Sequence, residues 1–158
     1  MPAYAADFLL DTTRAAVNLA RSGCLERCPD LKIILSHAGG FVPYAAERLS
    51  HHCAPDGTPQ DGLDRLRRFY HDTALSSSPY ALPSLLAFAD PSHITYGSAW
   101  PYAPSTKSAH FTRMLDDFPL PDDQRHGINR GNAETLFPRL AHKRPSSTAA
   151  FPSNTAYR

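Results

Sequence analysis

Residues 31–40 read LKIILSHAGG, a stretch typical of a buried strand that ends beside a functional site. A short, nearly continuous apolar run of this kind indicates a strand covered on both faces in a parallel sheet, and here it consists of Leu31, Ile33, Ile34 and Leu35. The run is followed by His37, Ala38 and two glycines, which allow backbone to pass close to a ligand. The stretch therefore predicts a strand whose carboxyl end presents a histidine.

Helical and strand patterns alternate on both sides of this stretch. Before it, Asp11, Thr12 and Thr13 are expected to cap a helix that ends near residue 28. After it, in order, come a helix at 42–51, a short helical piece at 63–67, the strand FYHDTAL at 69–75, a helix at 79–89 and the strand HITYGS at 93–98. This order predicts an α/β fold with about three parallel strands and flanking helices.

The remaining chain divides into a helical part and a tail. Helices are expected at 107–118, 121–128 and 132–140. From residue 142 on, Pro, Ser, Thr and Ala dominate without apolar periodicity, a composition typical of disorder. We therefore expect one domain over residues 1–141 and a disordered tail over 142–158.

Composition narrows the possible partners. The chain has 158 residues, 42% of them hydrophobic, and a formal net charge of +1. A nearly balanced charge argues against nucleic acid as a partner, and no apolar run approaches the roughly 20 residues of a membrane span. The N-terminus also lacks the basic segment of a secretory signal, so we expect a cytoplasmic protein. The cysteines are Cys24, Cys28 and Cys53, an odd number without a CxxC pair, so we expect reduced thiols.

Several residues could carry chemistry. The stretch ITYGSAW at 94–100 has the pattern of a strand that delivers its next side chain to a site, yet that side chain is the methyl group of Ala99. Taken alone, His37 is more often an ordinary hydrogen-bonded residue than a ligand. His71 and Asp72 alternate along one strand and should face opposite sides, so they should not form an acid and base pair.

Two other groups leave their roles open. Ser76, Ser77 and Ser78 could donate hydrogen bonds to a substrate carboxylate, or they could cap the next helix. Trp100 could line a pocket mouth or simply pack. The run His51-His52-Cys53 is expected to be structural, because adjacent residues of a helix point about 100° apart.

Five motifs together resemble a known family. They are DLKIILSHAGG, FVPYAAERL, FYHDTALSSSPYALPSLLA, HITYGSAWPYAP and INRGNAETLF. In this order they are similar to the C-terminal half of the amidohydrolase-related (amidohydrolase 2) family, which includes aminocarboxymuconate-semialdehyde decarboxylase and 6-methylsalicylate decarboxylase. The resemblance implies half of a TIM-like (β/α)8 barrel, with the family's divalent metal, zinc or manganese, at the carboxyl ends of the strands. The HxH motif of the family's first half has no counterpart here.

The resemblance also implies roles for single residues. His37 matches a metal histidine, Ala99 occupies the position of the metal-site aspartate, and Ser76–Ser78 with Trp100 would shape the substrate site. A methyl group binds no cation and accepts no proton, and one imidazole does not hold a metal tightly. We therefore expect a metal-dependent decarboxylase or hydrolase of small aromatic or unsaturated carboxylic acids that is inactive in this form.

Two alternatives remain open. Three strands alone leave open sheet edges, which favour covering by another chain. The chain could be a non-catalytic half-barrel that binds a partner, for example as a homodimer. It could also be one subunit of a split barrel, with an N-terminal half-barrel on a separate chain.

Overall fold

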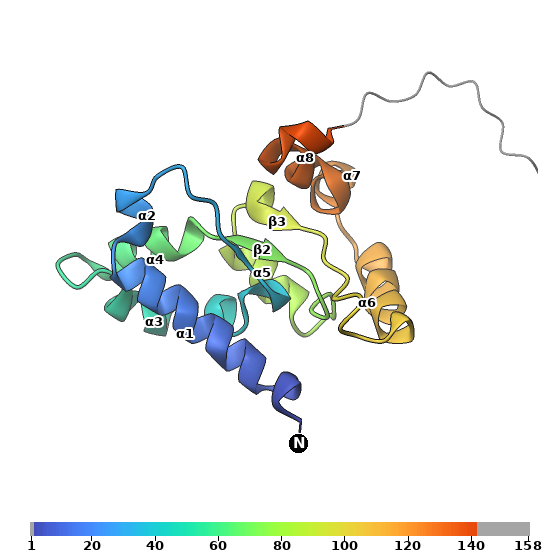
Figure 1. The fold of residues 1–158 in the computed structure, drawn as a ribbon, viewed down its shortest axis with the longest axis horizontal. Coiled ribbons are helices and arrows are strands. Elements are labelled where there is room, and N and C mark those ends of the chain that lie inside the picture. The colour runs from blue at the N-terminus through green and yellow to red at the C-terminus, as the bar shows by residue number, and fades with distance from the viewer. Residues whose placement is uncertain (1, 142–158) are drawn as a thin grey trace, which may run out of the picture.

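A three-stranded parallel sheet lies at the centre of the computed structural model, which describes residues 2–141 (Figure 1). Its order is β1 (Ile34–Leu35), β2 (Tyr70–Asp72) and β3 (Ile94–Thr95). In the register, Leu35 lies opposite His71, which in turn lies opposite Ile94. The predicted α/β fold with three parallel strands and flanking helices is confirmed.

Helices connect the strands and follow the last of them. In chain order they are η1 (Ala3–Ala5), α1 (Asp7–Arg21), α2 (Cys24–Arg27), η2 (His37–Gly39), α3 (Val42–Cys53), α4 (Pro59–Arg67), α5 (Leu82–Phe88), η3 (Pro91–His93), α6 (Ser105–Asp117), α7 (Asp122–His126), η4 (Gly127–Gly131), α8 (Asn132–Leu136) and η5 (Pro138–Leu140). In Figure 1, α1 to α4 gather on the left, whereas α6, α7 and α8 follow one another on the right. None of the helices between residues 2 and 141 is long and apolar enough to cross a membrane.

The hydrophobic core lies between the sheet and its helices. Helix α3 packs against α1, α4 and α5, and buried side chains of these four helices share one core cluster with Leu35 and Ile94 of the sheet. The largest fully buried apolar side chains are Phe69, Leu66, Leu82, Leu85, Ile94, Leu115, Ile128 and Val42. Because they come from both sheet and helices, burial of these side chains holds the strand ends in fixed relative positions.

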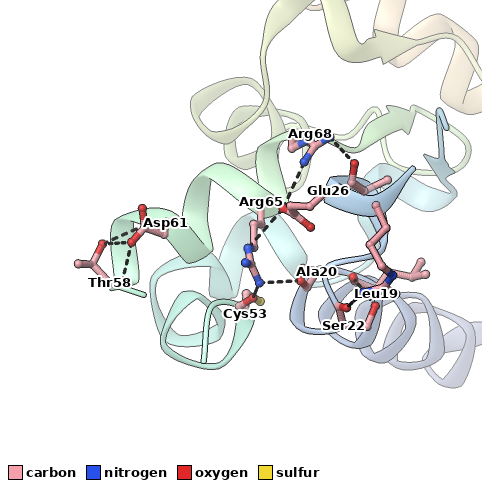
Figure 2. Close-up of polar contacts among 11 residues, drawn as sticks. Leu19, Ala20, Ser22, Glu26, Cys53, Thr58, Asp61, Arg65 and Arg68 are labelled. Carbon is pink, nitrogen blue, oxygen red and sulfur yellow. Dashed lines mark hydrogen bonds and ion pairs between the residues drawn. The ribbon is translucent and has the colours of Figure 1, made fainter. Parts of the chain in front are cut away.

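Arg65 joins the ends of three helices (Figure 2). From α4, its guanidinium Nη1 donates hydrogen bonds to the carbonyls of Ala20 at 3.2 Å and Cys53 at 3.0 Å, in the last turns of α1 and α3. Glu26 lies beside it, 3.4 Å from Arg65 Nε and 3.2 Å from Nη1 of Arg68. Carbonyls at the end of a helix lack hydrogen-bond donors within the helix, and the guanidinium of Arg65 is the donor here.

The first helix begins earlier than its apparent cap. The prediction that Asp11, Thr12 and Thr13 cap it is wrong, because α1 begins at Asp7 and contains all three. Thr13 is accommodated inside the helix since its hydroxyl donates to the carbonyl of Leu9 at 2.7 Å. The same hydroxyl accepts the backbone N–H of Phe41 at 2.9 Å, which ties α1 to the segment after β1.

The paired strands are shorter than the apolar runs that predict them. Burial of β1 on both faces is not observed, since Ile34 is 40% exposed on a strand that has a single neighbour in the described part of the chain. The helix expected from residue 79 begins at Leu82, because the carbonyl of Ser78 first accepts the N–H groups of Ala81 and Leu82 in a turn. The predicted helices after β3 are present with shifted ends, and the proposed tail at 142–158 lies outside the described residues.

Candidate functional site

Each strand of the sheet is followed by a residue in the left-handed backbone region. After β1 come His37 at φ +55° and Ala38 at φ +57°, after β2 comes Leu75 at φ +53°, and after β3 comes Ala99 at φ +60°. This conformation costs a non-glycine residue about 1–2 kcal/mol and is concentrated at functional sites. Since the strands are parallel, these residues follow the same edge of the sheet, which is the candidate site.

His37 is held at this edge by its backbone. Its N–H donates a hydrogen bond of 2.9 Å to Oδ1 of Asp72, at the end of the neighbouring strand. The ring is half-buried, and its Nδ1 is buried without a hydrogen-bond partner among residues 2–141. An imidazole with a free ring nitrogen can bind a cation or exchange a proton.

Asp72 is the central polar residue of the site. Its Oδ1 also accepts the N–H of Ala74 at 3.0 Å. Burial raises the pKa of the Asp72 carboxyl, while the hydrogen bonds from Ala74 and His37 partly oppose that rise. Gly97 of the segment after β3 packs directly on it, since a Cβ there would lie 2.9 Å from the carboxyl carbon Cγ. The carboxylate therefore meets the ends of all three strands.

His71, the neighbour of Asp72, belongs to the core instead. It is fully buried and lies edge-on to the ring of Phe88 in α5, with centroids 5.9 Å apart. Burial, with a smaller contribution from His93, lowers the pKa of His71 to about 4, so the ring is neutral. Gly39 lies against it, where a Cβ would be 2.7 Å from Nδ1. His71 and Asp72 thus face different surroundings and form no pair, in agreement with the strand alternation.

The segment after β3 presents no ionisable side chain at position 99. Ala99 is half-buried, and its carbonyl accepts the N–H of Ala103 at 2.9 Å. Trp100 follows, 66% exposed, and its N–H donates to the hydroxyl of Ser98 at 3.2 Å. The loop is thus formed by backbone contacts, and an indole side chain stands in solvent beside it.

The serine run is mostly occupied with its own backbone. Ser76 donates its hydroxyl to the carbonyl of Ala74 at 3.1 Å, and Ser77 donates to that of Thr73 at 3.3 Å, both in buried positions. Ser78 is half-buried and begins the turn before α5 through its carbonyl. Substrate binding by these serines and by Trp100 stays a prediction.

The remaining cysteine and histidine candidates do not gather. Cys53 is buried, and burial raises the pKa of its thiol, whereas His51 and His52 are exposed. Within the described part of the chain, no three His, Cys, Asp or Glu side chains lie close enough together to hold a metal ion. These residues alone therefore do not provide the usual ligand number of a catalytic metal site.

Sequence reasoning missed the role of Asp72. The alternation of the strand places its side chain opposite the buried His71, and this was the one available signal. The contact with His37 spans 35 positions of the chain and has no local pattern.

Comparisons with known proteins place these features in a family context. The model of the amidohydrolase family matches residues 6–139. A 6-methylsalicylic acid decarboxylase of Penicillium expansum is 42% identical over 139 residues, which cover 85% of this chain and 43% of that protein. The chain thus spans less than half the length of this relative.

Solved structures show the same fold. A crystal structure of an amidohydrolase II superposes with a TM-score of 0.78 at 30% identity, over 86% of this chain and 44% of that one. A dihydroxybenzoic acid decarboxylase of Polaromonas sp. JS666, with bound manganese and the inhibitor 2-nitroresorcinol, gives a TM-score of 0.69 at 26% identity, over 83% of this chain and 40% of that one. The three strands and their helices correspond to part of a TIM-type barrel.

Proposed function

The chain belongs to the amidohydrolase family, and we propose that it forms the C-terminal half-barrel of a metal-dependent decarboxylase for a small aromatic carboxylic acid. One observation carries this proposal: His37, Asp72 and the Gly97–Ala99 segment meet at the carboxyl ends of parallel strands. In barrels of this kind the active site lies at that end. The aromatic substrate class is taken from the 6-methylsalicylic acid decarboxylase relative.

His37 is the proposed metal donor of this chain. Its buried, unpartnered ring nitrogen is compatible with coordination by a neutral imidazole. The residues between 2 and 141 lack the further ligands, so we do not expect this chain alone to hold zinc or manganese tightly. The manganese in the dihydroxybenzoic acid decarboxylase supports a divalent metal as the partner of His37.

Ala99 is the reason we propose that this form does not turn over substrate. A carboxylate at this position could bind a cation or move a proton, and the methyl group of alanine does neither. The surrounding loop keeps a left-handed φ of +60° at Ala99, which aspartate tolerates better than most residues.

The proposed substrate site extends from this loop. Trp100 offers an exposed ring face on which an aromatic acid could stack, and Ser78 is the serine of the run without a side-chain hydrogen bond among the described residues. Ser76 and Ser77 would reach a carboxylate only after giving up their bonds to the carbonyls of Ala74 and Thr73.

A chimeric barrel tests this proposal. The chain is fused behind the part of the Penicillium decarboxylase that it does not match, with Ala99 or with Ala99→Asp. We expect the Ala99→Asp fusion to bind one manganese or zinc ion and to release carbon dioxide from 6-methylsalicylic acid, while the Ala99 fusion releases none. Adding His37→Gln to the active fusion should abolish both properties. Equal turnover with Ala99, or with His37→Gln, would exclude the proposed roles.

A second function is favoured by the free edge of β1. Ile34 is 40% exposed there, and among residues 2–141 the strand has a neighbour on one side only. An N-terminal half-barrel on another chain, or a second copy of this chain, would cover this edge. A monodisperse monomer at high concentration would argue against the homodimer, and one tightly bound ion per purified chain would argue against a non-catalytic role.

A further inference from the structure

We propose that Asp72 is a positioning residue that fixes the backbone of His37 at the carboxyl edge of the sheet. This inference rests on the proposed function, which gives His37 its role as a metal donor. Hydrogen bonds and close packing surround this one carboxylate.

The geometry joins three strand ends at this carboxylate. Oδ1 of Asp72 accepts the N–H of His37 at 2.9 Å and the N–H of Ala74 at 3.0 Å, so the segments after β1 and β2 share one acceptor atom. The segment after β3 closes on the same side chain, because Gly97 leaves no room for a Cβ beside the Cβ and Cγ of Asp72. The Thr73 hydroxyl accepts the N–H of Gly97 at 3.2 Å and holds this glycine in place.

The backbone of His37 needs such a bond. His37 and Ala38 are consecutive non-glycine residues in the left-handed region, at φ +55° and φ +57°. Such conformations persist where surrounding contacts over-determine them. An N–H left without an acceptor away from water is unfavourable, and Oδ1 of Asp72 satisfies the N–H of His37. Asp72 thus stabilises the unfavourable backbone conformation of His37 at the carboxyl edge of the sheet.

Amide hydrogen exchange of the 158-residue chain, followed by NMR, tests the proposal. In Asp72→Ala we expect the His37 amide to exchange at least about tenfold faster and its resonance to shift, because its hydrogen bond is lost. Asp72→Asn retains an acceptor oxygen, so the acceleration should be smaller. The matched control is Asp90→Ala: Asp90 also accepts the N–H two residues on, at 2.8 Å from Ser92, but lies before the amino end of β3, away from the carboxyl ends of the strands. It should affect Ser92 and leave His37 unchanged.

Two results would overturn the proposal. One is a His37 amide whose exchange in Asp72→Ala stays within about twofold of the parent chain. The other is equal acceleration of all core amides, including that of Leu66, since this would mean a merely structural loss of stability.

A second variant decides the matter where Asp72→Ala does not fold. Gly97→Ala adds a methyl group whose nearest neighbours are atoms of Asp72 and Ala74, and Gly97 is outside the left-handed region. It should displace the carboxylate and shift the His37 amide resonance, whereas Gly131→Ala, with its nearest contact at 3.4 Å, should not. An unmoved His37 resonance in Gly97→Ala would refute the positioning role.

The chimeric barrel separates this inference from the proposed function. In the Ala99→Asp fusion, Asp72→Asn should lower kcat while KM changes little, because the substitution disturbs the position of His37 and leaves the substrate contacts intact. A fusion without any activity would contradict the proposed function. The hydrogen-exchange experiment on the chain would still test the positioning role of Asp72 independently. An active fusion with an unchanged kcat in Asp72→Asn would overturn the positioning role alone.

Discussion

The side-chain amide of Asn132 donates a hydrogen bond of 2.7 Å to the carbonyl of Ile94 in β3. Its Nδ2 also donates to the carbonyl of Pro91 at 2.8 Å, so one side chain fastens α8 to the entrance of the last strand.

Replacing Asn132 by alanine should therefore destabilise the fold. Two strand-side carbonyls lose their donor, which we expect to lower the free energy of unfolding by about 1–3 kcal/mol. Urea unfolding measures this change. Asn18→Ala, on the exposed face of α1, is the control and should stay within about 0.5 kcal/mol of the parent.

Arg65 and Glu26 allow a test of which contact stabilises the helix ends. Glu26 is 38% exposed in its ion pairs, so Glu26→Gln should cost less than about 1 kcal/mol. Arg65→Met removes the donor from the carbonyls of Ala20 and Cys53 and should cost about 2 kcal/mol or more. A larger loss in Glu26→Gln than in Arg65→Met, again by urea unfolding, would mean that the ion pairs dominate.

His71 should make stability depend on pH. Its pKa falls from 6.5 in the unfolded chain to about 4 in the fold, so between these values the unfolded state binds the proton and the folded state does not. Stability is therefore lost as the pH falls from about 6.5 to 4, in total by about 3 kcal/mol.

The His71→Leu variant isolates this effect. Urea midpoints measured from pH 7 to pH 4 should fall less steeply in the variant than in the parent. The raised pKa of Asp72 acts in the opposite direction, since its folded form takes up a proton more readily, and it is present in both chains. Identical pH profiles would show that His71 does not carry the dependence.

Ala99→Gly should reveal the strain after β3. Glycine adopts φ +60° freely, whereas alanine does so at a cost, so the substitution relieves the folded state. The same change at the exposed helical position Ala15 should destabilise by about 1 kcal/mol. We expect the two substitutions to differ by at least about 1 kcal/mol in thermal or urea unfolding, and an equal cost at both positions would contradict the strain.

Ala99→Asp in the chain alone should leave metal affinity unchanged. It adds one carboxylate to one imidazole, and a catalytic metal site needs about three protein ligands. Isothermal titration with manganese or zinc should show no gain over the parent chain. Tight binding at one ion per chain would mean that further ligands lie within this sequence.

The sequence predicted the parallel sheet because each strand carries a local signal. LKIILSH has its apolar run, and the strands around Tyr70 and Ile94 lie at the spacing of βα units. The exposure of Ile34 could not be predicted from its own run, since burial there depends on a second neighbouring strand. The bond from His37 to Asp72 likewise depends on how two loops meet in space.

The start of α1 illustrates a different limit. Asp11, Thr12 and Thr13 have the residue types of a cap, yet Thr13 binds the carbonyl of Leu9 and the helix continues through them. Capping residues are favoured at helix ends without being excluded from interiors, so residue type alone did not locate this end.

The left-handed residues after the three strands affect how such a site can change during evolution. Ala99 has a left-handed φ although its side chain carries no functional group, so the conformation of this loop does not depend on the side chain at position 99. Point mutation can therefore exchange the chemistry at position 99 while the architecture that surrounds it is inherited intact.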